Sequence, residues 1–190
     1  IYTLSLCDLA VLKNSGFDIC CVLGNSMGFY TSLVAAGALP FEDGLHLVQT
    51  MGAHPVTGGQ IIYPIVNGKW IIDHELETQT HQILAEIRDK GEDYFVSVSI
   101  HLGGYLILAG TDLGIKELLA ALPKIKIGQN NYPFQLAGHS AFHTKLMTQA
   151  SKNGLEQLKN LGWKSPDIPL IDGRGFVWKP KITDPIELFN

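Results

Sequence analysis

The residues best suited to chemistry form the segment Gly24-Asn25-Ser26-Met27-Gly28, which has the pattern G-x-S-x-G. An apolar run at 17–23 precedes it and predicts a buried parallel strand, and a helix-favouring run at 29–36 follows it. A sharp strand-to-helix turn of this kind holds a serine hydroxyl out as a nucleophile. The N–H of Met27, at the start of the helix, would stabilise an oxyanion. The alternative is an ordinary N-capping serine in a glycine-rich turn.

A serine nucleophile needs a general base, and the chain has seven histidines. Three of them fall on predicted helices among polar neighbours and are expected at the surface: His46, His74 and His81. Two others, His139 and His143, lie close together near the start of a helix expected over 141–161. The pattern by itself does not choose between these two. For either one, a core or capping histidine is the alternative.

These candidates need a scaffold, and the two ends of the sequence predict a large α/β subdomain with a parallel sheet, formed by residues 1–55 and 137–190. Besides the elements around Ser26, the expected elements are helices at 1–14, 41–51 and 141–161, a strand at 168–171, and a last helix that opens with Pro185 in its first turn. The first helix begins at the start of the chain and no closing element follows the last one. We therefore expect both ends of the domain to be missing.

The middle of the chain, residues 56–136, predicts a smaller subdomain inserted into the larger one. The expected elements are strands at 60–66, 69–72, 94–100, 105–109 and 124–136 and helices at 74–90 and 112–122. Asn67-Gly68 marks the turn between the first two strands, and Asp112 is the expected helix cap. The order β-α-β-β-α-β is that of a ferredoxin-like subdomain.

Composition narrows the classes of partner. The chain is 46% apolar and 17% charged with a net charge of -4, so it can build a sizeable core. The mild negative charge argues against nucleic acid, because phosphate binding needs a basic face. No apolar stretch reaches the ~20 residues of a membrane span, and we expect no membrane partner.

The three cysteines, Cys7, Cys20 and Cys21, do not form a spaced disulfide framework. They predict reduced core residues in a cytoplasmic protein. The sequence predicts neither a metal site nor a bound cofactor.

The sequence from Gly24 to Leu39 resembles the nucleophile region of malonyl-CoA:acyl-carrier-protein transacylases and of the acyltransferase domains of polyketide and fatty-acid synthases. Residues 41–48 continue the similarity. Two later segments resemble the family in the same order: 106–110 is similar to the strand before its second subdomain helix, and 140–147 to its catalytic-histidine segment. A ferredoxin-like insert is a feature of the same family.

The resemblance implies that Ser26 is the nucleophile and that His143, not His139, is its base. Ser26 would attack an acyl-CoA thioester to give an acyl-serine ester. The phosphopantetheine thiol of an acyl carrier protein would then take the acyl group, with His143 carrying the proton both ways. Acyl-CoA and the carrier protein are thus the implied partners, in fatty acid or polyketide biosynthesis.

This sequence departs from the family at several positions. Malonyl-specific members have a carboxylate-clamping arginine 25 residues after the nucleophile, where this chain has Met51. Asn25 replaces a usual histidine, Phe29 a common glutamate, and His101 a usual asparagine. The family's N-terminal oxyanion segment and the C-terminal segment that orients the histidine fall outside the 190 residues.

Because a thioether cannot hold a carboxylate, the sequence predicts a monocarboxylic acyl group in place of malonyl. We expect four side chains to contact the substrate: Asn25, Met51, His101 and Phe142. Two alternatives share the same residues. One is an acyl hydrolase of this fold that clears acyl groups from carrier proteins, and the other is an inactive domain that docks carrier proteins.

Overall fold

The computed structural model describes residues 1–189, which divide into two compact units. The first contains Ile1–His54 and the described residues from Lys152 onward, and the second is Pro55–Ser151. The sequence predicts that residues 137–151 belong to the first unit, and this differs from the structure. They join the second unit because Ala141 is fully buried and its N–H donates to the Thr57 carbonyl over 2.8 Å.

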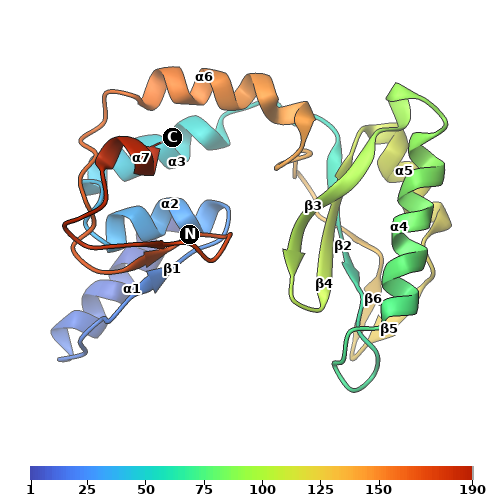
Figure 1. The fold of residues 1–190 in the computed structure, drawn as a ribbon, viewed down its shortest axis with the longest axis horizontal. Coiled ribbons are helices and arrows are strands. Elements are labelled where there is room, and N and C mark those ends of the chain that lie inside the picture. The colour runs from blue at the N-terminus through green and yellow to red at the C-terminus, as the bar shows by residue number, and fades with distance from the viewer. Residues whose placement is uncertain (190) are drawn as a thin grey trace. The chain divides into compact units, whose positions relative to one another are not determined.

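The first unit combines helices with a small mixed sheet (Figure 1). Its elements are α1 (Tyr2–Asn14), β1 (Val22–Leu23), α2 (Met27–Ala35), α3 (Phe41–Gly52), most of α6 (Thr148–Leu158), β8 (Leu170–Ile171), β9 (Val177–Trp178) and α7 (Pro185–Phe189). In the sheet β1 pairs with β8 in parallel and β8 pairs with β9 antiparallel. The predicted helices at 1–14, 29–36 and 41–51 and the helix that opens at Pro185 are confirmed.

The strand that leads to Ser26 is shorter and more exposed than predicted. The sequence predicts a buried strand over 17–23, but only Val22 and Leu23 are in strand conformation, and Leu23 is 71% exposed. Within residues 1–189, β1 is an edge strand that pairs with β8, and Leu23 lines an open groove beside α1 and α2.

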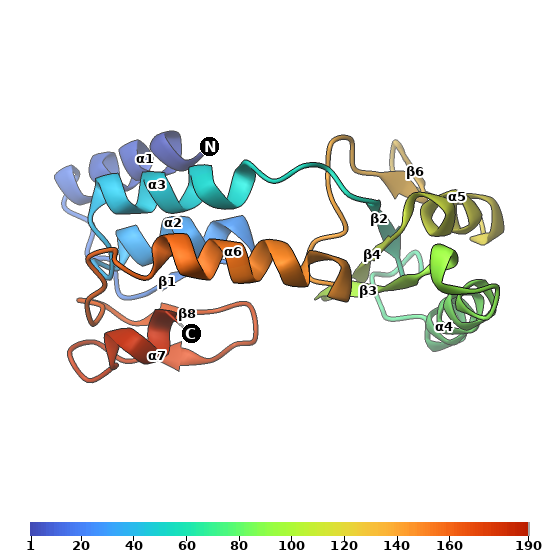
Figure 2. The ribbon, with the colours of Figure 1, turned by 90° about the horizontal axis from the view of Figure 1, so that it is seen from above.

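The core of the first unit lies among its helices and β8. α3 lies beside α2 and α6 (Figures 1 and 2). The buried residues of this core are Leu33, Ala36, Ala38, Leu39, Leu47, Leu158, Leu170 and Leu188. The predicted core positions of the cysteines are wrong: all three are free thiols, but Cys7 and Cys20 are exposed because α1 and the segment before β1 lie at the surface.

The second unit has the predicted ferredoxin-like topology. Its elements are β2 (Gly59–Pro64), α4 (His74–Arg88), η1 (Glu92–Tyr94), β3 (Val96–Leu102), β4 (Tyr105–Gly110), α5 (Asp112–Ala121), β5 (Ile125–Ile127), β6 (Asn130–Tyr132), β7 (Phe134–Gln135) and η2 (Lys145–Met147). The sheet order is β3-β4-β2-β7, with every neighbouring pair antiparallel. The helices α4 and α5 cover one face of this sheet (Figures 1 and 2).

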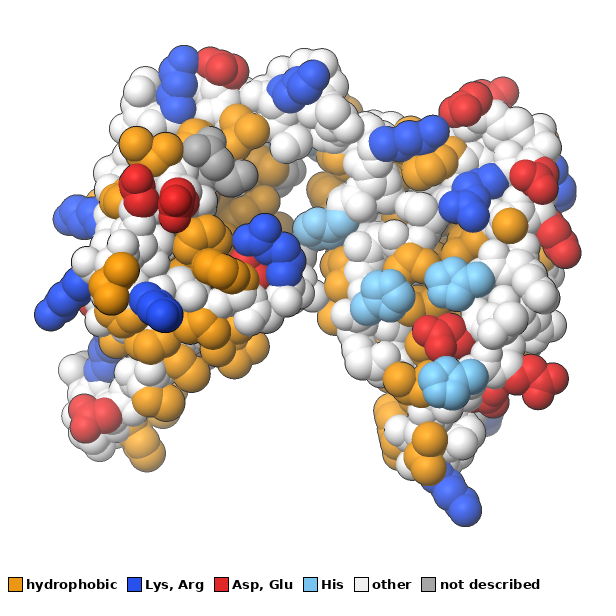
Figure 3. All heavy atoms as spheres, viewed as in Figure 1, with side chains coloured by type: hydrophobic (Ala, Val, Ile, Leu, Met, Phe, Trp, Pro, Cys, Tyr) orange, Lys and Arg blue, Asp and Glu red, His pale blue; other side chains and the backbone are white. Residues whose placement is uncertain are grey.

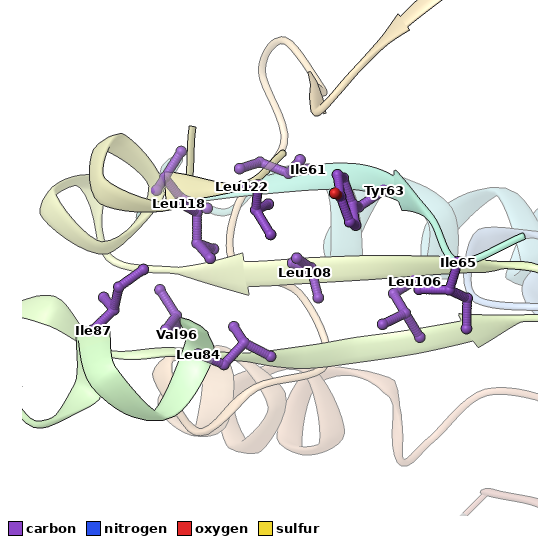
Figure 4. Packing of buried hydrophobic residues seen from close by; sticks show 11 residues of the cluster. Ile61, Tyr63, Ile65, Leu84, Ile87, Val96, Leu106, Leu108, Leu118 and Leu122 are labelled. Carbon is purple, nitrogen blue, oxygen red and sulfur yellow. The ribbon is translucent and has the colours of Figure 1, made fainter. Parts of the chain in front are cut away.

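A closed apolar core fixes this arrangement (Figure 4). Alternate residues of β2, among them Ile61 and Tyr63, point toward the helices, where they meet Leu84 of α4 and Leu118 of α5. All four are at most 2% exposed. The helix α4 begins where the carboxylate of Asp73 accepts a hydrogen bond from the N–H of Leu76.

Three local predictions in this unit are corrected. Residues 69–72 form no strand but a single bridge between Val66 and Ile72, because the side chain of Asn67 binds the N–H groups of the turn. The predicted strand at 124–136 is three short strands. The cap of α5 is Thr111, whose hydroxyl accepts from the N–H of Gly114, and not Asp112.

The helix predicted over 141–161 begins later than expected. Residues 141–144 are not helical, η2 follows them, and α6 starts at Thr148. His143 has φ +57°, a left-handed conformation that a right-handed helix excludes, and Thr144 caps η2. Among residues 1–189, no helix combines the length and the apolar composition needed to cross a bilayer.

Candidate functional site

The strand-to-helix turn at Ser26 is held in a strained conformation. Ser26 lies between β1 and α2 with φ 53° and ψ -123°, a region that residues other than glycine rarely adopt. The turn closes through hydrogen bonds of 2.9 Å from the N–H of Gly28 to the Asn25 carbonyl and from the N–H of Phe29 to the Ser26 carbonyl. This is the geometry expected of a nucleophile elbow.

Close packing explains one of the two glycines of the motif. A Cβ on Gly24 would lie 2.2 Å from the carbonyl oxygen of Gly28, so no side chain fits there. A Cβ on Gly28 would meet no atom within 4 Å. Close packing therefore requires a glycine at position 24 and not at position 28.

Met27 is the first residue of α2, and its side chain is 45% exposed. The N–H groups of the first helical turn have no carbonyl acceptor within their own helix. The backbone N–H of Met27 is thus one of the donors that concentrate positive charge directly beside Ser26.

Asn25 packs against the β8–β9 turn: a Cβ on Gly173 would lie 2.8 Å from Asn25 Oδ1. Asp172, next to Gly173, stabilises that turn. Its carboxylate accepts hydrogen bonds from the backbone N–H groups of Arg174 and Phe176, from the Arg174 guanidinium and from the Trp178 indole. Burial raises the pKa of Asp172, but these donors outweigh it and leave the pKa below its ordinary value.

Met51 lies in the last turn of α3 and packs toward α6. It contacts the first unit's core, and a Cβ on Gly154 of α6 would lie 2.7 Å from Met51 Sδ. Gly154 is buried, and a larger residue at this position would collide with the thioether. The structure therefore gives Met51 a packing role whether or not it also contacts a substrate.

In the second unit, His143 lies in a loop that is tied down on both sides. Before it, the N–H of Thr57 donates to Ser140 Oγ over 3.1 Å. After it, Thr144 Oγ1 donates to the Ala141 carbonyl over 2.7 Å. The residue as a whole is exposed, yet the protein atoms around the imidazole desolvate its charged form and lower the pKa of His143 from its ordinary value.

The loop can approach β2 because of a glycine. A Cβ on Gly58, which has φ +66°, would lie 2.1 Å from the Gly110 carbonyl oxygen and 3.3 Å from the Cβ of Ala141. No other residue type allows both this conformation and this approach.

The two candidate histidines differ in their surroundings. His139 Nδ1 lies 3.0 Å from Gln60 Oε1, and its ring meets the Phe142 ring edge-on with centroids 6.1 Å apart. Gln60 Nε2 in turn reaches Ser99 Oγ over 3.0 Å, and Ser99 Oγ donates to the Phe142 carbonyl over 2.9 Å. His139 is thus bound into a network of side chains.

The remaining candidate residues are divided between the two units. His101 is the second-to-last residue of β3, pairs with Leu106 of β4 and is exposed. The three histidines predicted at the surface are exposed: His46, His74 and His81. Asn25, Ser26 and Met27 adjoin one another in the first unit, and Phe142 and His143 adjoin one another in the second.

Sequence reasoning missed Gln60 and Ser99. One signal could have found Gln60: it is a single amide in the otherwise apolar strand Gly59–Pro64. Ser99 carries no comparable signal, because alternating polar residues are ordinary in a strand with one solvated face.

The chain resembles known proteins in sequence. No protein-family model matches it. It is 28% identical over 174 residues to the malonyl CoA-acyl carrier protein transacylase of Bacillus subtilis, a match that covers 90% of this chain and 52% of that protein. The chain spans about half the length of the curated relatives it matches.

Solved structures share the fold. FabD from Acinetobacter baumannii matches all of this chain and 57% of its own, with a TM-score of 0.74 and 22% identity. The acyltransferase domain of an iterative polyketide synthase of enediyne biosynthesis has a TM-score of 0.68 at 22% identity, covering 99% of this chain and 46% of its own. A malonyl-transacylase solved in complex with a type II polyketide acyl-carrier protein has a TM-score of 0.71 at 17% identity, over 95% and 55%. In sequence, over nine tenths of its length, this chain resembles the malonyl-CoA:acyl-carrier-protein transacylases, and it shares its fold with them and with polyketide acyltransferase domains.

Proposed function

We propose that this chain carries the catalytic residues of an acyltransferase that moves an acyl group from acyl-CoA to the phosphopantetheine thiol of an acyl carrier protein. The observation that carries the proposal is the backbone of Ser26, φ 53° and ψ -123°, between a strand and a helix. Such strain persists where the surrounding structure enforces it, and it is typical of functional sites. The similarity to transacylases over most of the chain supports this reaction.

In the proposed reaction Ser26 Oγ attacks the thioester carbonyl and gives its proton to the imidazole of His143. The N–H of Met27 stabilises the oxyanion of the tetrahedral intermediate. The C–S bond breaks, and CoA leaves as the thiol with the proton from His143. The carrier thiol then gives its proton to His143 and attacks the acyl-serine ester. The C–O bond to Ser26 breaks, and His143 returns the proton to Ser26 Oγ. CoA and phosphopantetheine are substrates here, and the proposal needs no bound cofactor.

The lowered pKa of His143 supports its role as the base. An ordinary histidine has a pKa of about 6.5, so a lower value keeps the imidazole neutral at pH 7 and able to accept the proton of Ser26. Acyl-CoA donors and free cysteines both fit a cytoplasmic setting, which we propose for the reaction.

For the donor we propose a monocarboxylic acyl group. The relatives named in the comparison are malonyl transacylases. By the resemblance in sequence, Met51 stands where malonyl-specific members of that family have a clamping arginine, and its sulfur packs against Gly154. A thioether offers a carboxylate no charge-assisted hydrogen bond. Asn25, His101 and Phe142 are the other residues that we propose contact the substrate.

The test is intact-mass spectrometry of the full-length protein after incubation with acetyl-CoA, octanoyl-CoA or malonyl-CoA, with Ser26→Ala as the control. We expect acetyl and octanoyl adducts on Ser26, none in the variant, and acyl transfer to added holo-carrier protein. A malonyl adduct alone would overturn the monocarboxylic assignment. Release of CoA with free acid in place of carrier loading would indicate the hydrolase. Absence of both adduct and CoA release would indicate a docking domain.

A further inference from the structure

Gln60 is a polar residue in a place that favours apolar ones. It is 3% exposed in an interior strand of the second unit's sheet, next to the fully buried Ile61. Its neighbours Ile61 and Tyr63 point toward the helices, so Gln60 points to the opposite face, where the loop around His143 lies. A buried amide without partners would cost about 1 to 3 kcal/mol, which makes its hydrogen bonds informative.

The hydrogen-bond partners of Gln60 fix which end of its amide group donates and which accepts. Gln60 Nε2 lies 3.4 Å from the Phe142 carbonyl, which can only accept, so the NH₂ group faces that carbonyl and Oε1 faces His139. His139 therefore donates through Nδ1. Gln60 Nε2 donates to Ser99 Oγ, and Ser99 Oγ donates to the Phe142 carbonyl. The chain of donors runs from His139 through Gln60 and Ser99 and ends on that one carbonyl oxygen, and hydrogen bonds linked in this way strengthen one another.

A backbone irregularity aims Ser99 at this carbonyl. The pairing of β3 with β4 shifts between Val98 and Ile100, so Ser99 is the extra residue of a β-bulge. Bulges change the direction in which a side chain points and occur often beside functional sites.

We propose that Gln60 is a positioning residue for His143, with Ser99 and His139 as its partners. The inference rests on the proposed function, in which His143 is the base. The Phe142 carbonyl belongs to the peptide group that enters His143, so the donors that bind this oxygen fix the orientation of that peptide plane. His143 has φ +57°, which costs about 1 kcal/mol or more for a residue with a side chain. The network holds the imidazole in one orientation despite this cost. It also makes His139 a positioning residue and not an alternative base.

The test measures steady-state acyl transfer by the full-length protein carrying Gln60→Met or Ser99→Ala. Each change removes a hydrogen-bonding group and leaves a side chain of similar or smaller volume. We expect kcat to fall about 10- to 100-fold, because a misplaced base costs this much, with KM for acyl-CoA unchanged. Ser99→Thr keeps the hydroxyl and should restore kcat. Gln135→Met, on an exposed strand of the same sheet, is the matched control and should behave like the unmodified protein.

A second measurement reads His143 without requiring activity. The ¹³C-labelled histidine spectrum is titrated, with the His143 signal assigned from His143→Gln. We expect Gln60→Met and Ser99→Ala to shift or broaden this signal and displace its titration midpoint, and Gln135→Met to leave it unchanged. An unmodified protein that forms no acyl-serine would defeat the proposed function, while the spectrum would still decide the positioning role. Full kcat together with an unchanged His143 signal in both variants would overturn the inference.

Discussion

The two units of this chain bury their apolar residues to different extents. The second unit closes a core between a four-stranded sheet and two helices, with Leu106, Leu108 and Leu118 fully buried. The first has a three-stranded sheet and leaves large apolar side chains in solvent, among them Leu4 at 70% and Leu23 at 71% exposed. Figure 3 shows hydrophobic side chains gathered over α1 and β1.

The same contrast is seen in the groove beside the elbow. An apolar groove of about 640 Å³ lies between α1 and α2 in the first unit and is lined in part by Leu9, Val22 and Met27. Contiguous exposed apolar surface of this kind marks places where proteins make further contacts. The fold of the second unit is stabilised mainly by the burial of apolar side chains. The first enforces the conformation of Ser26 by close backbone packing and hydrogen bonds, so different substitutions should damage the two units.

The largest effect is expected from the same truncation made in each unit. Leu108→Ala opens a cavity in the second unit's closed core and should lower the free energy of unfolding by about 4 kcal/mol. Leu4→Ala, on the exposed face of α1, should change it by at most about 0.5 kcal/mol. Urea denaturation gives the two values. Amide hydrogen exchange should show faster exchange in β2 and β4 for Leu108→Ala, and equal losses for both variants would contradict the contrast.

A smaller effect separates the two glycines of the elbow. Gly24→Ala places a methyl group 2.2 Å from a backbone oxygen and should cost about 3 kcal/mol and greatly reduce labelling of Ser26 by a fluorophosphonate. Gly28→Ala meets open space within a helix and should keep the labelling while stabilising α2 by up to about 1 kcal/mol. Thermal unfolding and probe labelling of both variants provide the measurement. Equal loss in both would mean that packing does not enforce the elbow.

The smallest effect concerns the β8–β9 turn and is pH-dependent. Because the pKa of Asp172 is lower in the folded chain than its ordinary value of about 3.9, its contribution is present above that value and is lost as the pH falls through the folded pKa. Asp172→Asn should cost about 1 kcal/mol at pH 7 and less as the pH falls below 4. Denaturation at pH 7, 5 and 3 tests this, and a cost independent of pH would show that the carboxylate's charge is unimportant.

Sequence patterns located the elements that are specified by neighbouring residues. The turn and the helix around Ser26 were predictable because glycine spacing and local propensity act within a few residues, whereas the length and burial of the strand before them were not. The β-α-β-β-α-β order was predictable for the same reason, since alternation and turn signals recur along the chain. The helix expected over 141–161 begins late because His143 has φ +57°, and the Phe142 carbonyl just before it accepts hydrogen bonds from Ser99 and Gln60, about 40 and 80 residues away in the chain, which no local pattern indicates.

The elbow, the class of the fold and the order of the inserted unit could be predicted from the sequence, because each depends on short-range patterns of apolar, glycine and capping residues. Three features became known only from the tertiary structure. They are the hydrogen bonding of His139 in a polar network, the membership of residues 137–151 in the second unit, and the packing of Met51 against Gly154. Each of these depends on contacts between segments far apart in the chain. A buried amide or a close backbone approach forms only when distant segments pack together. Its free energy comes from removing polar groups from water at that contact, which local sequence patterns do not encode.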